Sequence, residues 1–173
     1  MTATTFLSAL PSLLMGLAAI LLVVAACCDV LTRLIPNSIP AALAVIGLVL
    51  RVVDGSWAWS LLAFAIVLAV TVFCWLRGWM GGGDVKLLAA CALLVPPGSV
   101  FPMITMVGIA GGGLALVYLV ARRVVPRPLP RGPGQRPTGY IARALRAEHW
   151  RLSRGAALPY AVAIAIGGLI SFT

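Results

Sequence analysis

Three long apolar stretches limit what this chain can fold into. No charged side chain interrupts residues 6–28, 57–76 or 100–121. A helix needs about 20 apolar residues to cross the hydrocarbon core of a bilayer. Because 62% of the 173 residues are hydrophobic and only 10% are charged, the chain has too little polar surface to cover a water-soluble globule. We therefore expect an integral membrane protein.

Three further apolar segments complete the expected fold. Residues 155–172 are nearly long enough to span the bilayer, whereas residues 36–50 and 85–95 are shorter than a usual crossing. Each short segment lies between longer ones, so each must reach or line the opposite face. We expect an all-α, polytopic membrane protein with about six transmembrane helices. It should form a single membrane-embedded domain, residues 1–173, because no other stretch is long enough to build a second core.

The basic residues lie almost entirely on one side of this expected topology. An amino terminus outside puts Arg33, Arg77, Lys86 and the nine arginines of the loop 122–154 on the cytoplasmic side, and it leaves only Arg51 outside. This bias agrees with the positive-inside rule. The net charge of +9 then reflects topology and attraction to anionic membrane lipids. No nucleic-acid partner is expected, because nucleic-acid binding would require a folded basic face.

The loop 122–154 belongs to the same domain. Residues 126–139 are rich in proline, glycine and arginine and predict a linker. Residues 140–154 predict a basic amphipathic helix in the headgroup region. In the apolar stretch before the loop, Gly108 and the glycines 111–113 predict close packing against another helix.

Two of the four acidic residues stand at the mouths of apolar segments, where a charge is costly. Asp29 follows the first apolar stretch, and Asp84 follows Gly81, Gly82 and Gly83 at the start of a short apolar segment. Ionisable groups at membrane depth are a default sign of function.

Counting crossings predicts where these two acids lie. Two complete crossings separate Asp29 from Asp84, so both should return to the cytoplasmic surface and meet there. If residues 36–50 only re-entered the membrane, the two acids would lie on opposite sides. Asp54 falls on the outer side of this scheme, where we expect a solvated loop charge or a helix cap.

Two carboxyl groups brought together at such a surface can hydrolyse a peptide bond. Low dielectric and mutual repulsion split their proton affinities, so one holds a proton while the other stays ionised. The ionised group can take a proton from water, and the protonated group can polarise a carbonyl and then protonate the leaving amine. Which acid is the base is left open. The only histidine, His149, lies in the basic loop, and no Ser-His or Cys-His arrangement lies near the membrane face.

The glycine run before Asp84 has two interpretations at this point. In the functional one, Gly81, Gly82 and Gly83 give the backbone freedom and let a substrate peptide and water approach the acid. In the structural one, the glycines form a turn and Asp84 is the N-cap of the next helix, stabilised by its positive end.

Four other residues are candidates for shaping the site. Arg33 lies four residues after Asp29 and either pairs with it on a continued helix or anchors the topology. Lys86 can reach a substrate carboxylate, a phospholipid or the neighbouring acid, or it can snorkel to the interface. Pro36 and Asn37 should shape the start of the second helix, with Asn37 as a hydrogen-bonding candidate.

No metal is expected. The four cysteines lie in apolar segments without metal-ligand spacing, where thiols behave as small hydrophobes and are not expected to pair. They are Cys27, Cys28, Cys74 and Cys91.

The segments around the two acids resemble the signature segments of the type IV prepilin peptidases, which are membrane aspartic proteases of the GxGD type. The resemblance rests on Asp29-Val30-Leu31-Thr32-Arg33-Leu34-Ile35-Pro36-Asn37, on Gly81-Gly82-Gly83-Asp84-Val85-Lys86-Leu87-Leu88-Ala89-Ala90, and on Leu158-Pro159-Tyr160-Ala161. It implies that Asp29 and Asp84 are the catalytic pair in a multi-pass protein of the bacterial cytoplasmic membrane. It also implies a prepilin or pseudopilin precursor as substrate, with its basic leader removed at the cytoplasmic face.

Larger members of that family carry a cytoplasmic insert with paired Cys-x-x-Cys zinc ligands, and they also methylate the new amino terminus. Because Asp29 directly follows the first apolar stretch here, the chain resembles the small, cleavage-only branch that serves Flp-type tight-adherence pili. That resemblance implies no methyl transfer and no cofactor. The alternatives from other classes are a small transporter or proton-conducting membrane subunit, in which intramembrane acids relay ions, and a structural assembly subunit. The oligomeric state is left open, a homo-oligomer included.

Overall fold

The computed structural model describes residues 3–124, 139 and 158–172. These residues form helices and no strand, which confirms the all-α fold class. The elements in chain order are α1 (Ala3–Thr32), α2 (Ser38–Val53), α3 (Trp57–Leu76), α4 (Gly82–Leu94), a short 3-10 turn (Pro97–Ser99), α5 (Val100–Val124) and α7 (Tyr160–Ile170). The predicted amphipathic helix 140–154 and nearly all of the predicted linker 126–139 lie outside the described residues.

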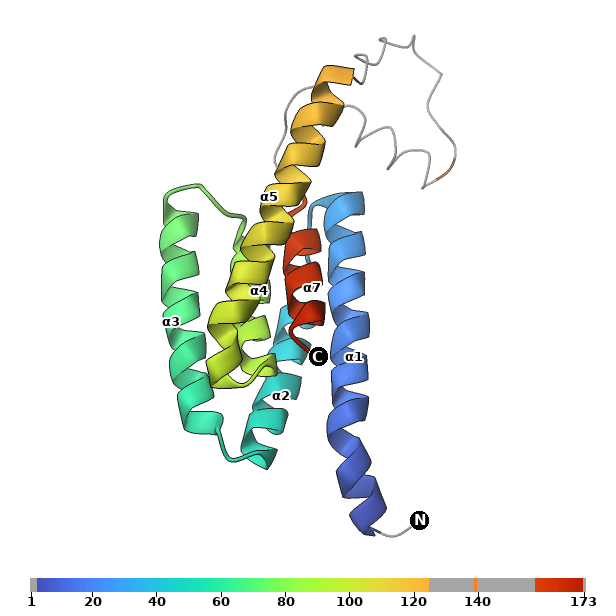
Figure 1. Cartoon of the computed structure of the whole chain (residues 1–173), viewed down its shortest axis with the longest axis vertical. Helices are drawn as coiled ribbons and strands as arrows, with labels where there is room; N and C mark the ends of the chain where they lie inside the picture. The colour runs from blue at the N-terminus through green and yellow to red at the C-terminus, as the bar shows by residue number, and fades with distance from the viewer. Residues whose placement is uncertain (1–2, 125–138, 140–157, 173) are drawn as a thin grey trace.

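Successive helices run in alternating directions. In Figure 1, α1 rises toward the top of the view, α2 descends, α3 rises, α4 descends, α5 rises and α7 descends. The end of α1 and the starts of α2, α4 and α7 therefore all point toward the upper end of the bundle. We call this the upper end throughout.

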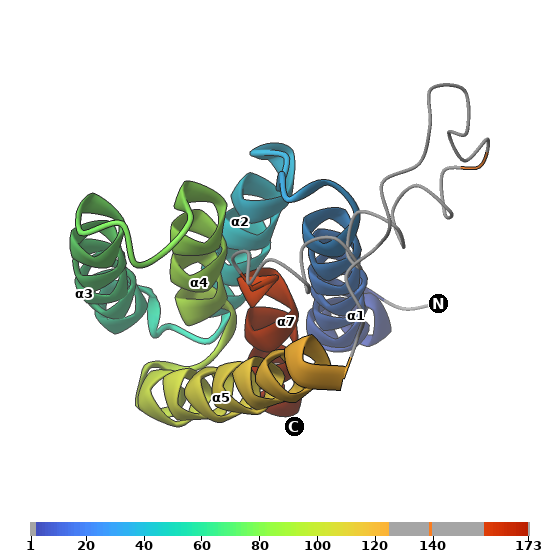
Figure 2. The ribbon, with the colours of Figure 1, turned by 90° about the horizontal axis from the view of Figure 1, so that it is seen from above.

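Two helices form the centre of the bundle. α4 packs between α2 and α3, whereas α7 packs between α1 and α5, and α4 and α7 also touch each other (Figure 2). All the residues of α4 from Leu87 to Leu94, together with Val85, are buried. A helix that is apolar on every side is expected in such a position. At 13 residues, α4 is only about 20 Å long, and α2, α3 and α7 enclose it.

Three helices are long and apolar enough to cross a membrane. They cover Ala9–Thr32, Trp57–Leu76 and Pro97–Val124, while α2 and α7 are shorter apolar helices. Their outer faces carry large exposed apolar side chains, for example Ile20, Ile66 and Leu116, as expected where lipid is the solvent. The chain is thus a membrane protein, and the number of six crossings stays a prediction.

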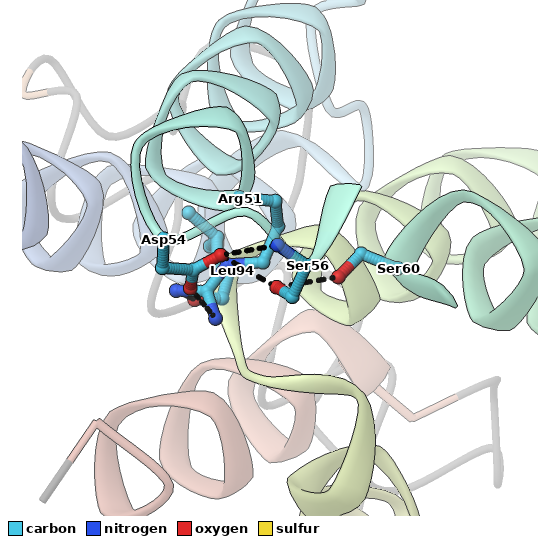
Figure 3. Close-up of polar contacts among 5 residues, drawn as sticks. All are labelled: Arg51, Asp54, Ser56, Ser60 and Leu94. Atoms are coloured by element: carbon cyan, nitrogen blue, oxygen red, sulfur yellow. Dashed lines mark hydrogen bonds and ion pairs between the residues drawn. The ribbon is translucent and has the colours of Figure 1, made fainter. Parts of the chain in front are cut away.

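A polar network joins α2, α3 and α4 at the end of the bundle opposite the upper end (Figure 3). Arg51 is buried, its Nη1 pairs with Asp54 Oδ2 at 2.7 Å, and its Nη2 donates to the carbonyl of Leu94 at 3.5 Å. Asp54 is the C-cap residue of α2, one of its two expected roles. Its Oδ1 accepts from the backbone N–H of Ser56 at 2.9 Å and from the Ser56 hydroxyl at 2.6 Å, and that hydroxyl lies 3.5 Å from the hydroxyl of Ser60.

These contacts set the charge state of Asp54. Partial burial raises the pKa of the carboxyl group, but the hydrogen bonds from Ser56 and the charge of Arg51 together outweigh that effect. The pKa of Asp54 consequently lies below its ordinary value of 3.8. The residue is ionised at neutral pH and can hold the buried guanidinium of Arg51.

Glycines let the central helices approach closely, but mostly not the predicted ones. A Cβ on Gly111 would lie 3.2 Å from the Tyr160 hydroxyl, whereas at Gly108 and at the glycines 112 and 113 it would meet no described atom within 4 Å. The structure confirms close packing at Gly111, and the described residues show none at the other three positions. The closest approaches are at Gly47, where a Cβ would lie 2.7 Å from the Leu93 backbone, and at Gly167, which packs on the Val107 backbone.

Candidate active site

The upper end of the bundle brings Asp29 and Asp84 together. Asp29 lies in the last turn of α1 and Asp84 in the first turn of α4, and both turns point to the same end (Figure 1). The two carboxyl groups are near enough for the charge of Asp29 to act on Asp84. The placement agrees with the count of crossings made from the sequence. It is inconsistent with a re-entrant segment at residues 36–50, because α2 runs the length of Ser38–Val53 and α3 returns.

Asp29 is held by the start of the last helix. Its side chain is buried, with a relative exposure of 7%, and its Oδ2 accepts a hydrogen bond from the backbone N–H of Ala161 at 3.1 Å. Ala161 is the second residue of α7, and the first N–H groups of a helix have no partner within it. A carboxylate is a favourable partner for them, since the helix dipole is positive there.

Ala161 is a part of the site that the sequence did not predict. Pro159 could have indicated it, because this proline is the N-cap residue of α7 and marks where the unpaired N–H groups of that helix begin. A backbone donor has no side chain of its own to mark it in the sequence.

Asp84 faces back toward the residue that begins its helix. The N-cap of α4 is Gly81, and Asp84 is the third residue of the helix, so the interpretation of Asp84 as the N-cap is wrong. Instead, the Gly81 backbone N–H donates to the Asp84 carboxyl group, which is half of a capping box. The other oxygen, Oδ1, is buried and has no hydrogen-bond partner among residues 3–124, 139 and 158–172. One oxygen of Asp84 is thereby fixed, and the other is available for chemistry.

The three glycines before Asp84 differ in what surrounds them. A Cβ would lie 3.0 Å from Asp84 Oδ2 if built on Gly81, 3.3 Å from the Ile35 side chain if built on Gly83, and 3.5 Å from Trp75 Nε1 if built on Gly82. None of the three has a positive φ, so backbone freedom is not what the segment uses. The absence of a side chain matters at Gly81 and Gly83, while Gly82 has room for one.

The remaining candidate residues lie at the same end. α1 stops at Thr32 and Arg33 adopts a left-handed conformation with φ 59°, so the idea of a continued helix at Arg33 is wrong. Its charge nevertheless acts on the Asp84 carboxyl group. Lys86 Nζ donates to Asn37 Oδ1 at 2.9 Å. Asn37 is the N-cap residue of α2 but makes no side-chain cap bond, because its oxygen is used to tie α2 to α4.

This arrangement has the parts that hydrolysis by carboxyl groups needs. Two acids lie near each other at one end of an apolar bundle, each oriented by a backbone N–H group. Such a pair can share one proton and act on a water molecule. Within the described part of the chain, no three His, Cys, Asp or Glu side chains gather into a group that could hold a metal ion.

Comparison with known proteins identifies a peptidase family. Residues 16–116 match the model of a family described as the type IV leader peptidase family. The matched range covers more than half of the chain and contains both acids, all of α2, α3 and α4, and most of α5. No curated protein and no solved structure gives a significant match.

Proposed function

The chain belongs to the type IV leader peptidase family, and on that premise we propose that it is a membrane aspartic endopeptidase with Asp29 and Asp84 as its catalytic pair. Its substrate in this proposal is the precursor of a type IV pilin of the Flp-like group, or of a pseudopilin. The observation that carries the proposal is the meeting of two carboxyl groups, from helices far apart in sequence, at one end of the bundle.

The proposed reaction uses one water molecule, and protons pass through the two carboxyl groups in both of its steps. The ionised carboxyl group takes a proton from water as the water oxygen attacks the peptide carbonyl, while the protonated carboxyl group donates to that carbonyl oxygen. The carbon–nitrogen bond of the resulting tetrahedral intermediate then breaks. The carboxyl group that took the proton from water gives it to the leaving amine, and the other carboxylate regains its proton from a hydroxyl group of the intermediate. The Ala161 N–H orients Asp29 and the Gly81 N–H orients Asp84, so neither acid has to be ordered when the substrate arrives.

The distribution of basic residues supports a site at the cytoplasmic face. Arg33, Lys86 and Arg77 follow or begin helices at the upper end, and Arg122 and Arg123 end α5 there too. Arg51, at the opposite end, is the exception, and it is neutralised by Asp54. By the positive-inside rule the upper end faces the bacterial cytoplasm, and the amino terminus lies outside.

The interior below the acids does not favour the alternative of an ion or proton relay. A relay needs ionisable groups spread through the membrane. In the described structure, the central helix α4 is buried and uncharged from Leu87 to Leu94, and the next buried charge is Arg51 at the far end. The polar groups that could carry chemistry are therefore concentrated at one end.

Co-expression with a candidate pilin precursor tests the proposal. We expect Asp29→Asn and Asp84→Asn each to lower the rate of leader removal by about 10²–10⁴-fold, as followed by the mass shift of the precursor, while membrane insertion is unchanged. The matched control is Asp54→Asn, which removes an acid at the opposite end; it should lower stability through the loss of the Arg51 pair but leave the cleavage rate per folded enzyme unchanged. Normal leader removal by either dyad variant would reject the mechanism.

A further inference from the structure

A groove between α1 and α7 opens beside Asp29. Its volume is about 410 Å³. It is lined by Val23, Ala26, Cys27, Val30, Leu31, Val162, Ala165, Ile166 and Leu169. Two of these, Val30 and Val162, directly follow Asp29 and Ala161, which are joined by the 3.1 Å hydrogen bond. The groove therefore reaches the level of the acids, and every side chain that lines it is apolar or a thiol.

The outer face of α1 continues the groove away from the acids. Six exposed residues recur along it at alternating spacings of four and three, and we call them the α1 seam: Leu13, Leu17, Ile20, Val24, Cys27 and Leu31. This is the spacing at which one helix presents a straight edge to a second helix. Cys27 and Leu31 also line the groove, so the seam leads into it.

α7 covers only part of α1. It has 11 residues and is therefore about 16 Å long, and it lies against the upper part of α1 (Figure 1). The seam from Leu13 to Leu31 covers 19 residues and is about 27 Å long, which is close to the thickness of the hydrocarbon core. Its lower part has no neighbouring helix among the described residues.

We propose that the groove and the α1 seam bind the apolar helix of the precursor, laid along α1 with the peptide bond to be cut beside Asp29. This inference rests on the proposed function, because it names how that substrate is held. Inside a membrane, helices associate by packing rather than by hydrophobic burial, and a seam as long as the bilayer provides such packing. A bound precursor helix also explains why the apolar surface ends at Asp29, because the peptide bond at the end of that helix would lie beside the carboxyl group. A lipid chain has no peptide bond for the acid to act on.

The chain carries its own probes for this site. Cys27 lies in the groove and is exposed, while Cys74 lies on α3, on the far side of the bundle (Figure 2). We would use full-length Asp84→Asn enzyme in membranes, to hold the precursor uncut, together with precursors bearing one cysteine at successive positions of the apolar helix. Oxidation should cross-link Cys27 at positions three or four residues apart, and it should leave Cys74 unlinked.

A second measurement uses cleavage by the active enzyme. Cys27→Trp fills the groove and should lower kcat/KM for the precursor at least tenfold, mainly by raising KM. Val70→Trp on α3 is the matched control, because Val70 is similarly exposed but lies away from the groove. Melting temperatures of these two variants should agree with that of the original chain.

The outcomes separate this inference from the proposed function. If the enzyme cleaves the precursor, but Cys27 forms no cross-link and Cys27→Trp is fully active, then the groove holds only lipid and the inference is overturned. If cross-links form with helical spacing but no precursor is ever cut, then the docking site stands and the peptidase proposal fails. Cross-linking to Cys27 and Cys74 alike would indicate random collision and would also overturn the inference.

Discussion

Alanine substitutions along Gly81, Gly82 and Gly83 test whether these glycines serve to let atoms approach closely. The Cβ of Gly81→Ala would lie 3.0 Å from Asp84 Oδ2, about 0.5 Å closer than an ordinary contact of about 3.5 Å. The carboxyl group must move by roughly that amount. A misplacement of 1 Å costs about 10²-fold in rate, so we expect about a tenfold loss in kcat. Stability should change little, because Gly81 is exposed and the new methyl meets only this side chain.

The other two positions should respond differently. At Gly83 the new methyl would lie 3.3 Å from Cβ and Cδ1 of Ile35, which links α1 to α2. Overpacking of this kind costs about 1–3 kcal/mol, and each 1 kcal/mol corresponds to about 2–4 °C in the melting temperature of a protein of this size. At Gly82 the contact of 3.5 Å with Trp75 is ordinary, and alanine favours a helix. Gly82→Ala should therefore keep both activity and stability.

The assay compares purified variants in lipid nanodiscs. Thermal unfolding gives the stability, and the cleavage rate of a saturating precursor gives kcat. Gly82→Ala is the internal control, since it changes the same segment by the same methyl group. If it impairs cleavage as much as Gly81→Ala does, the segment acts through backbone flexibility and the reasoning from distances is refuted. Full activity of Gly81→Ala would refute it as well.

Three further predictions concern other parts of the bundle. Gly167→Ala places a Cβ 2.6 Å from the Val107 backbone N, so it should lower stability by about 1–3 kcal/mol and reduce cleavage. Gly112→Ala, whose Cβ would meet no described atom within 4 Å, should change neither stability nor cleavage. Equal melting curves for the two variants would contradict this prediction. Asp54→Asn should destabilise the protein at neutral pH, and the difference from the original chain should vanish as pH falls through the lowered pKa of Asp54, because that carboxyl group is then protonated in both states. A deficit that stays constant in acid would exclude the ion pair with Arg51 as its cause. Cleavage should follow a bell-shaped pH profile, as expected for a pair that needs one protonated and one ionised acid, and a flat profile across the carboxyl range would argue against the dyad.

Helix positions could be predicted where charge and glycine bracket an apolar run. Residues 57–76 are uncharged between Asp54 and Arg77, and α3 has these same bounds. The start of α4 was predicted at residue 85 but lies at Gly82. Glycine has a weak helix propensity, so local reasoning assigns these glycines to a turn. In the structure, the packing of Gly83 against Ile35 stabilises the extra helical residues.

The candidate site could be predicted only in outline. Counting crossings was enough to place Asp29 and Asp84 at one end, since that depends on the number of helices and not on side-chain detail. The bond from Ala161 to Asp29 joins residues 132 apart through a backbone group that sequence patterns do not mark. The burial of Arg51 was also missed, because positive-inside reasoning treats a lone arginine as solvated, while the structure pairs it with Asp54 and with the carbonyl end of α4.

Because the Asp29–Ala161 hydrogen bond joins the first and last helices, the candidate site is complete only after α7 has been synthesised. Asp29 emerges from the ribosome early, but the amide that orients it belongs to α7, which is translated more than 130 residues later. A partly translated chain holds Asp29 without the Ala161 amide, so on the proposed function we expect no cleavage before α7 has docked against α1.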